Sequence, residues 1–487
     1  MPTNLWPSAI ELLRFAPELF LTLVGAILMV LEANTGEGGK RPLGYLAIGA
    51  LVGALGLSLY SATFPGSAFR DMVVVDGFGT FFRVLCCGAG ALTCLISLSY
   101  LDREGHQQGE YYTLILFSVV GQCVMATANE LIMVFIGIEI SSIATYILAG
   151  YMRDDQRNNE SAIKYFLLGS FATAFLLYGI AWIYGLSGST TLGPIREAIL
   201  NPQAEESFPL LGAACALVAV GFAFKVSAAP FQAWAPDVYQ GAPAPVTAFM
   251  SVGPKAAAFA VFLRVFRSAF TPLSSQWEPL VAWLAVATMT VGNFAALRQT
   301  NLKRLLAYSS IANAGYILIA VAARSELGVQ AVMFYLAAYV LMTLGAFSII
   351  SYFARKGECY TEISDLSGLA QRQPVLAGLF AIFALSMIGV PLTAGFFGKF
   401  YIFKAALDAD WVWLAVLGLL NSALAAWYYL QLLVVMYMRE PGLATEQMEP
   451  VPAGVTVTAW TTAALTLLLG VFPNLLLQWT VSSTLAK

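Results

Sequence analysis

Residues 221–255 read GFAFKVSAAPFQAWAPDVYQGAPAPVTAFMSVGPK, and this stretch decides the fold. It begins in an apolar run that contains Lys225 and ends in a second apolar run that contains Lys255. Between the two lysines, any helix is interrupted by Pro230, Pro236, Pro243 and Pro245. A lysine in hydrocarbon is costly, and a broken helix there leaves backbone groups that only protein or a water-filled cavity can satisfy. The stretch therefore predicts a polar path through a membrane.

The composition restricts the protein to the membrane class. The chain has 487 residues, of which 59% are hydrophobic and only 11% are charged. A soluble domain has about 25% charged residues. The net charge of −3 says nothing about nucleic acid, but the basic residues of the sequence form no patch, and no nucleic-acid partner is expected. The lipid bilayer is the expected surrounding.

The residues that usually hold redox groups are too few and too scattered for such a role. The six cysteines form no C-x-x-C pair, and the single histidine, His106, lies in the polar segment DREGHQQGE. No G-x-G-x-x-G follows a strand, so no dinucleotide fold is indicated. We therefore expect no cofactor and no metal in this chain.

Fourteen apolar runs are long enough to cross a bilayer, which takes about 20 residues each. They predict an all-α polytopic membrane protein with about fourteen transmembrane helices. The predicted spans are 9–33, 42–63, 77–100, 111–128, 131–151, 161–186, 207–229, 244–266, 278–297, 303–323, 327–353, 373–404, 411–438 and 453–480.

The basic residues indicate an orientation. With the N-terminus outside, twelve arginines and lysines, Lys303 among them, fall on the inner side and eight on the outer side, as the positive-inside rule requires. An even number of spans then places both termini on the outer face. Arg83 and Lys164 lie near the starts of their spans, where their side chains can reach the interface.

Four charged residues lie deeper in the predicted spans and are the candidate site. They are Glu139, Lys225, Lys255 and Lys399. Intramembrane charges are rare and costly, so each is a functional candidate. The alternative interpretation is a set of structural ion pairs that fixes helix packing.

Two features recur at an offset of five helices. Residues 141–144 in the fifth span and 309–312 in the tenth both read SSIA, and the seventh and twelfth spans break near Pro230 and Pro391. An odd offset inverts the second copy, so the pattern predicts two inverted five-helix repeats, each with a broken helix. Lys225 and Lys399 are then the expected equivalent charges of the two halves.

These residues suggest a proton relay. A carboxylate stabilises a buried ammonium, so movement of Glu139 relative to Lys225 would load and unload a proton there. Lys255 and Lys399 would continue the relay through water held by the broken helices. Supporting polar groups are expected at Ser309, Ser310, Asn313 and Tyr316, although plain helix packing also accounts for each.

Four segments of the chain resemble subunit N of proton-pumping NADH:quinone oxidoreductase, respiratory complex I. They are FIGIEISSI (135–143), FKVSAAPFQAWAPDVYQGAPAPVTAF (224–249), TNLKRLLAYSSIANAGY (300–316) and ALSMIGVPLTAGFFGKFY (384–401). The phrase PDVYQGAPAPV separates that family from the sister subunits L and M. The resemblance implies a fourteen-helix antiporter-like subunit, with Glu139 and Lys225 as a charge-coupled pair, Lys255 as connecting lysine and Lys399 in the second half-channel.

The resemblance also implies partners and a location. Other membrane subunits of the J, K, L and M types are expected around the chain, in a bacterial inner membrane. NAD, FMN, iron–sulfur clusters and quinone are expected in partner subunits, so the chain is part of a translocating enzyme without a redox centre of its own. The family usually has histidine where this chain has Gln232 and Asn313. Neither amide can titrate, so a histidine step in the relay is in doubt.

The predicted organisation has four parts: an N-terminal three-helix segment at 1–110, a first repeat at 111–270, a second repeat at 271–440 and a C-terminal helix at 441–487. The alternative function is a subunit of a multi-subunit sodium/proton antiporter, which shares the fold. A purely structural role and a free-standing solute transporter are less well supported by the motifs.

Overall fold

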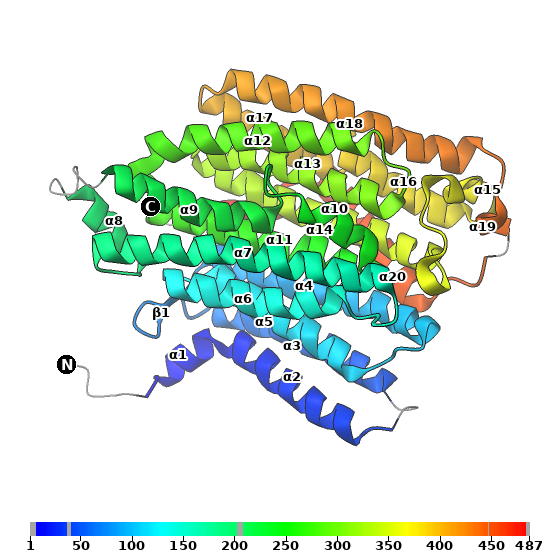
Figure 1. Ribbon diagram of the computed structural model, residues 1–487, viewed down its shortest axis with the longest axis horizontal. Helices are drawn as coiled ribbons and strands as arrows, with labels where there is room; N and C mark the ends of the chain where they lie inside the picture. The colour runs from blue at the N-terminus through cyan, green and yellow to red at the C-terminus, as the bar shows by residue number, and fades with distance from the viewer. Residues whose placement is uncertain (1–5, 37–39, 202–207, 447, 484–487) are drawn as a thin grey trace.

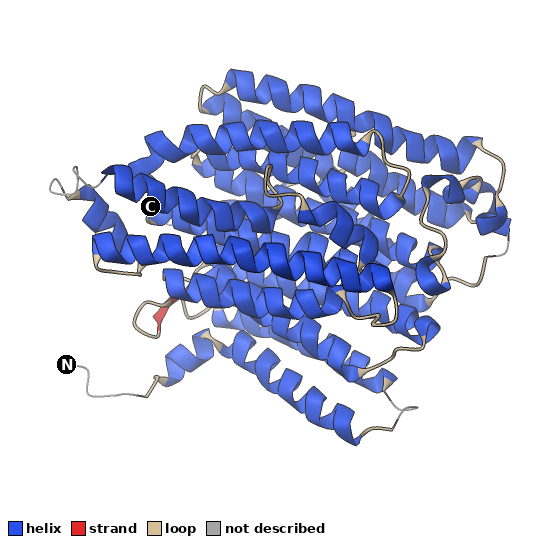
Figure 2. Ribbon diagram, in the orientation of Figure 1, coloured by secondary structure: helices blue, strands red, loops and turns tan. Residues whose placement is uncertain are grey.

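The computed structural model describes residues 6–36, 40–201, 208–446 and 448–483, and it is helical almost throughout (Figures 1 and 2). Most helices run side by side along one direction, as the spans of a membrane protein do. The first half comprises α1 (Ala9–Arg14), α2 (Ala16–Asn34), α3 (Arg41–Ser61), α4 (Gly77–Glu104), α5 (Gly109–Thr127), α6 (Leu131–Ala149), α7 (Gln156–Ser187), α8 (Leu192–Leu200), α9 (Phe208–Val226), α10 (Trp234–Gly241) and α11 (Ala244–Ser268).

The second half continues in the same way. It comprises α12 (Ser274–Ala296), α13 (Leu302–Ala322), α14 (Glu326–Phe353), α15 (Leu369–Arg372), α16 (Pro374–Ile388), α17 (Ala394–Asp408), α18 (Val412–Met438), α19 (Leu443–Glu446), α20 (Ala453–Val471) and α21 (Asn474–Ser482). Short 3₁₀ helices lie at η2 (Thr271–Leu273), η3 (Lys356–Glu358) and η4 (Ile363–Leu366).

The predicted set of fourteen spans is confirmed. By length and composition, thirteen of the described helices can each cross a membrane. The fourteenth crossing is divided between α16 and α17, which are separated at residues 389–393. The first and last predicted spans differ in detail, because the short helices α1 and α21 form separate pieces beside α2 and α20.

A small β-hairpin marks one end of the bundle, which is the predicted outer end. Strands β1 (Gly66–Ala68) and β2 (Val73–Val75) pair antiparallel, with Gly66 opposite Val75. The Arg14 guanidinium donates to the Phe64 carbonyl at 2.9 Å and so ties α1 to this hairpin. At the same end, Gly77 packs against Ser483. The first and last described helices therefore lie at the same end of the molecule.

The two repeats enter the bundle from opposite ends. The first repeat comprises α5, α6, α7, α9 with α10, and α11, and the second comprises α12, α13, α14, α16 with α17, and α18. Each repeat opens with a closely crossing helix pair that needs a glycine. A Cβ at Gly121 would lie 2.5 Å from the Ser141 amide nitrogen, and one at Gly292 would lie 2.6 Å from that of Ala312. A close helix crossing that requires glycine therefore begins both repeats.

Three helices form the centre of the bundle. Nearly all residues of α11, α13 and α14 are buried, although all three have the composition of membrane spans. Helices such as α2, α7 and α18 instead expose large apolar side chains, for example Leu23, Phe171 and Trp427. The polar side chains on the central helices therefore lie inside the protein and away from lipid.

The prediction that Arg83 reaches the interface is wrong. Arg83 is fully buried, and its Nε and Nη2 donate to the two carboxylate oxygens of Glu18, at 2.8 and 3.0 Å. The span of α4 begins at Gly77, so Arg83 lies nearly two turns inside it, next to a carboxylate from α2 that compensates its charge. Lys164 behaves as predicted, because its part-exposed ammonium pairs with Glu160 and Asp237.

Candidate functional site

The first helix break holds Lys225 in the last turn of α9. The helix ends at Val226, Ser227 adopts a positive φ of 60°, and the chain resumes as α10 at Trp234. The Lys225 Nζ donates to Ser142 Oγ at 2.5 Å and to the Tyr146 hydroxyl at 3.5 Å, both from α6. It also lies 5.3 Å from the centre of the Tyr146 ring. The SSIA motif of the first repeat therefore provides the oxygen that receives this lysine.

Glu139 lies on the same helix as Ser142 but does not contact Lys225. It is half-buried at the edge of the bundle, between the exposed side chains of Ile136 and Ile143. Its buried Oε1 has no hydrogen-bond partner among the described residues, and its charge acts on Lys225 only from a distance. Glu139 and Lys225, the predicted pair, are thus separated in this structure, and Ser142 accepts the hydrogen bond from the lysine instead.

Lys255 lies at the centre of the molecule, on α11, and is 2% exposed. Its Nζ donates to the carbonyl oxygen of Ser310 at 3.0 Å and also to the Ser310 hydroxyl. The Tyr339 hydroxyl donates to the same Ser310 Oγ at 2.8 Å. The SSIA motif of the second repeat therefore also receives a lysine, but that lysine comes from the first repeat.

A stripe of polar residues on α13 leads away from Lys255. The Ser309 hydroxyl bonds to the Tyr429 hydroxyl of α18. One turn on, Asn313 donates to the Ser309 carbonyl at 2.9 Å and accepts from the Tyr335 hydroxyl at 2.5 Å. The positions 309, 310, 313 and 316 recur with helical spacing and share one face.

The stripe ends in a cluster around Asn293 of α12. Asn293 Nδ2 donates to the Tyr316 hydroxyl and to Asn421 Oδ1, both at 3.1 Å, and the Tyr428 hydroxyl donates to Asn293 Oδ1 at 3.1 Å. All these groups are at least nine-tenths buried. Buried polar groups that bond one another in this way form a continuous network between helices.

The second break holds Lys399 in a different manner. Helix α16 ends at Ile388 and is capped by Gly389, which has φ 95°, and α17 begins at Ala394. The Lys399 Nζ donates to the carbonyl oxygens of Met387 and Ile388, at 2.9 and 3.0 Å, and to Ser422 Oγ at 2.9 Å. These carbonyls are the free end of α16, where the helix dipole is negative and favours a cation.

Lys399 connects the second break to the polar stripe. Its Nζ lies 4.7 Å from the centre of the Tyr316 ring, over which a cation is attracted. The eight predicted residues therefore lie in two groups along the predicted path: Glu139 and Lys225 on α6 and α9, and the other six on α11, α13 and α17. Between Lys225 and Lys255, the described contacts do not make this path continuous.

The expected equivalence of Lys225 and Lys399 does not hold residue by residue. Lys225 precedes its break and lies on α9, whereas Lys399 follows its break and lies on α17. With Pro230 and Pro391 aligned, the counterpart of Lys225 is Ser386, which is buried and accepts from the Gly395 amide. The sequence showed that both repeats contain a helix break. It did not show that the lysine precedes the break in one repeat and follows it in the other.

Several polar residues of the path were missed from the sequence. Tyr335 and Tyr339 lie one turn apart on α14, and Asn421, Ser422, Tyr428 and Tyr429 lie on α18. Their signal was the presence of polar atoms in otherwise apolar spans. Lys303 was also misplaced, because it was counted with the inner loops although its side chain is fully buried in the first turn of α13.

Comparison with known families supports one assignment over most of the length. The family model described as NADH:quinone oxidoreductase/Mrp antiporter, TM, matches residues 128–425. NADH-quinone oxidoreductase subunit N 1 of Solibacter usitatus is 56% identical over 473 residues, which cover 97% of each chain. NADH-quinone oxidoreductase subunit N 2 of Koribacter versatilis is 44% identical over 485 residues, again covering 97% of each.

Solved structures agree with the sequence relatives. A chain of respiratory complex I from Thermus thermophilus superposes with a TM-score of 0.82 at 34% identity, covering 96% of this chain and all of that one. A chain of the Mrp complex from Dietzia sp. DQ12-45-1b reaches a TM-score of 0.84 over 97% of each chain, but at 20% identity. The second likeness shows a shared fold only.

Proposed function

The chain belongs to the NADH:quinone oxidoreductase/Mrp antiporter family of membrane subunits, and from this premise we propose that protons move through it along Glu139, Lys225, Lys255 and Lys399. Its relatives are subunit N of NADH:quinone oxidoreductase, so the chain is a proton-translocating, multi-pass membrane subunit of that complex. The antiporter alternative has weaker support, because the Mrp likeness extends to the fold alone.

One observation carries the proposed route. Lys255 bonds to Ser310, Asn313 bonds to Ser309, and Lys399 lies over the Tyr316 ring, so buried polar groups follow one another along α13 at the centre of an otherwise apolar bundle. Buried polar groups are expensive in a membrane and persist where they serve a pathway. Lysines at both ends of this line, each bonded to hydroxyl or carbonyl oxygens, can give and receive protons through water.

The transfer is driven from outside the chain. Glu139 lies at the edge of the bundle with an unpartnered oxygen, so a charge change in a neighbouring subunit would reach it first. Movement of Glu139 toward Lys225 would stabilise the ammonium there, and its withdrawal would favour release of the proton toward Lys255. No bond other than O–H and N–H bonds forms or breaks in these steps.

The two amides that replace the usual histidines fit different roles. Asn313 is part of the polar stripe, where it accepts from Tyr335 and donates to Ser309 without titrating. Gln232 lies in the first break, and its buried Oε1 has no partner among the described residues. We propose that water bonds to Gln232 and replaces the histidine step there.

Electron transfer takes place elsewhere in the complex. We propose membrane subunits of the J, K, L and M types as neighbours, and NAD, FMN, iron–sulfur clusters and quinone in partner subunits. The relatives are bacterial, which supports an inner-membrane location, and the positive-inside count supports outer termini. Purification from the native membrane should recover these neighbours together with the chain.

The proposed route is tested by Lys255→Met in the assembled complex. This change keeps the bulk of the side chain and removes its charge, so the complex should assemble while NADH-driven proton pumping falls by about tenfold or more. The measurement is proton uptake by everted membrane vesicles, normalised to the amount of this subunit. Wild-type pumping by Lys255→Met would refute the route. In the isolated chain, stoichiometric iron or flavin would refute the assignment of redox groups to the partners.

A further inference from the structure

A polar cavity opens at the predicted inner end of the bundle, away from the β-hairpin. It has a volume of about 600 Å³ and lies where the ends of α4, α10 and α14 meet the α6–α7 loop. Its titratable lining includes Glu104, His106, Asp155, Arg157 and Glu358. The cavity is large enough for many waters, each of which occupies about 30 Å³ in the liquid.

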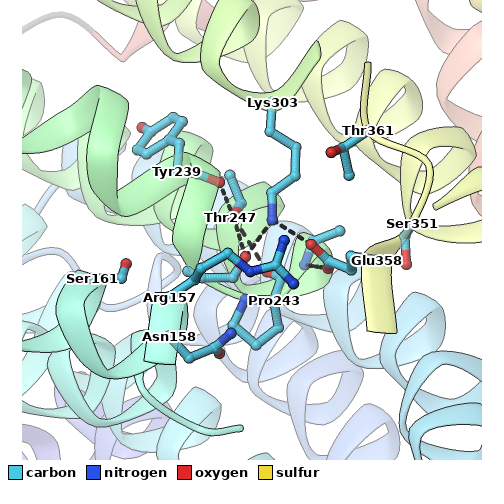
Figure 3. A network of polar contacts seen from close by, with 12 residues as sticks. Arg157, Asn158, Ser161, Tyr239, Pro243, Thr247, Lys303, Ser351, Glu358 and Thr361 are labelled. Atoms are coloured by element: carbon cyan, nitrogen blue, oxygen red, sulfur yellow. Dashed lines mark hydrogen bonds and ion pairs between the residues drawn. The ribbon is translucent and has the colours of Figure 1, made fainter. Parts of the chain in front are cut away.

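A buried ion pair forms the floor of this cavity. The Lys303 side chain extends from α13 toward Glu358 and the turn at Pro243 (Figure 3). Its Nζ lies 2.6 Å from Glu358 Oε2 and donates to the Ala242 carbonyl at 2.5 Å. Lys303 is fully buried, whereas Glu358 is 13% exposed. The carboxylate therefore faces the cavity and the ammonium faces the interior.

The protein holds Glu358 in place at a cost in backbone energy. Arg355, Gly357 and Glu358 all have positive φ, at 57°, 69° and 48°, a region that non-glycine residues rarely adopt. Three contacts hold the carboxylate there. Its Oε1 accepts from the Ala244 amide at the N-terminus of α11, at 2.6 Å, and from the Tyr100 hydroxyl at 2.9 Å, while Oε2 receives Lys303.

Two neighbouring carboxylates of the cavity, Asp155 and Glu104, are less suited to pass a proton inward. Partial burial raises the pKa of Asp155, but hydrogen bonds and charge from Arg157 outweigh it and lower the pKa overall, so this carboxylate stays ionised. Glu104 bonds to the Gly357 amide at 3.0 Å and thereby supports the loop. Glu358 is the cavity carboxylate that also contacts a buried lysine of the interior.

The interior side of the pair leads toward Lys255. Lys303 and Ser310 lie seven residues apart on α13, which is about 10 Å along a helix, and Ser310 receives Lys255. Beside Ser310 lies Tyr239 of α10, whose buried hydroxyl interacts with Ser310 and Tyr339 but makes no well-formed hydrogen bond among the described residues. An unpartnered buried hydroxyl is a natural place for a bridging water.

We propose that the cavity is the port through which protons from the inner side reach Lys255, and that the Lys303–Glu358 ion pair closes it. This inference rests on the proposed function and adds to it the two residues that control access. A hydronium ion in the cavity gives its proton to Glu358 Oε2, forming an O–H bond and leaving a water molecule. The neutral carboxyl no longer holds the ammonium of Lys303, so the pair opens. When the pair re-forms, the same proton leaves Glu358 for the water on the interior side.

The test compares a single and a double variant in the whole complex. Glu358→Gln keeps acceptors for Ala244 and Tyr100 but cannot cycle a proton, so pumping and coupled turnover should fall about tenfold at neutral pH. Glu358→Asp keeps a carboxylate that can take up and release a proton, so it should retain most of the pumping that Glu358→Gln loses. Asp154→Asn is the matched control, because it removes a carboxylate from the same cavity lining and should leave both readouts unchanged.

The double variant Lys303→Met with Glu358→Gln separates a port from a structural pair. Replacing a buried ion pair by neutral residues is often neutral for stability, so a merely structural role would be rescued in the double variant. A port would not be rescued, and turnover should stay about tenfold low. Wild-type pumping by the double variant, with Lys255→Met still impaired, would overturn the port and leave the proposed function standing. Wild-type pumping by Lys255→Met as well would refute both.

Discussion

Each of the two helix breaks holds a lysine inside the bundle, but the groups that bind the two lysines differ. At the first, the partners of Lys225 among the described residues are two side-chain hydroxyls, Ser142 and Tyr146, of which the second is 3.5 Å away. At the second, three oxygens within 3.0 Å satisfy all three ammonium donors of Lys399, and two of them are the last carbonyls of α16. Lys399 therefore binds the free carbonyls of its helix break, whereas Lys225 lies beside its break and bonds to side chains of α6. The two inverted repeats thus differ in how they hold their lysines: Lys399 is firmly bound and Lys225 is loosely bound.

The largest expected effect is that of Lys225→Ala. Because Ser142 also donates to the Ile138 carbonyl, few polar groups lose their only partner, and the complex should assemble. Turnover coupled to pumping should fall by about tenfold or more, since the relay loses its first cation. Lys225→Met should behave alike and show that charge, not volume, is responsible. Normal pumping at wild-type subunit levels would remove Lys225 from the route.

Lys399→Ala should slow turnover several-fold and also lower the amount of assembled complex. The Met387 and Ile388 carbonyls would lose their partner, and each buried unsatisfied group costs about 1–3 kcal/mol. Subunit abundance on a native gel, compared with that of Lys225→Ala, measures the difference between the two breaks. Ser422→Ala is the control, because it removes one acceptor and leaves both carbonyls paired. Equal abundance of the two lysine variants would mean that the breaks do not differ as described.

A double-mutant cycle tests the distant action of Glu139 on Lys225. Glu139→Gln should reduce turnover more than Glu139→Asp, because the charge matters more than the length of the chain. Combined with Lys225→Ala, the losses should be non-additive, with a coupling of about 0.5–3 kcal/mol in the activation free energy. The readout is turnover at fixed subunit abundance. Strictly additive losses would show that Glu139 acts on another group.

The smallest expected effect is that of Asp237→Asn on the second half of the first break. Asp237 joins α10 to α7 and α13 through Lys164 at 2.7 Å and Arg304 at 2.6 Å. All three side chains are about a third exposed or more, and such pairs contribute about 0.2–1 kcal/mol each. Turnover should therefore stay within about twofold of wild type. A loss as large as that of Lys225→Ala would show that this ion cluster controls the position of α10.

The sequence predicted the fold because the hydrophobic spans and the prolines are local signals. Runs of apolar residues predict the crossings, and Pro230 and Pro391 mark both breaks. Glu139, Lys225, Lys255 and Lys399 were predicted as candidates because a charge in an apolar run is costly and conspicuous. The sequence could not show what each lysine bonds to, because its partners come from helices far away in the chain. Ser422 and Tyr146 have no special signal until α18 and α6 are in place.

Arg83 and Lys303 show why position in a span is a poor guide to exposure. Both lie near the start of a predicted span, where a long side chain usually reaches the interface. Both are instead fully buried, because a carboxylate from elsewhere meets each of them: Glu18 for Arg83 and Glu358 for Lys303. Whether such a cation is buried thus depends on an acidic residue far away in the chain. The position of the cation within its own span does not reveal that partner.

The pair between Glu18 and Arg83 has a consequence for how the chain is made. Glu18 is synthesised 65 residues before Arg83, so α2 meets the bilayer before the cation that neutralises its carboxylate in the folded protein has been made. Helix α2 should therefore wait beside the insertion machinery, or hold a protonated acid, until α4 emerges. Nascent chains arrested before Arg83 should cross-link to the translocon longer than chains arrested after α4. In an Arg83→Met chain the delay should persist even after α4 has emerged. Equal release times for chains arrested before Arg83 and after α4 would rule out this order of assembly.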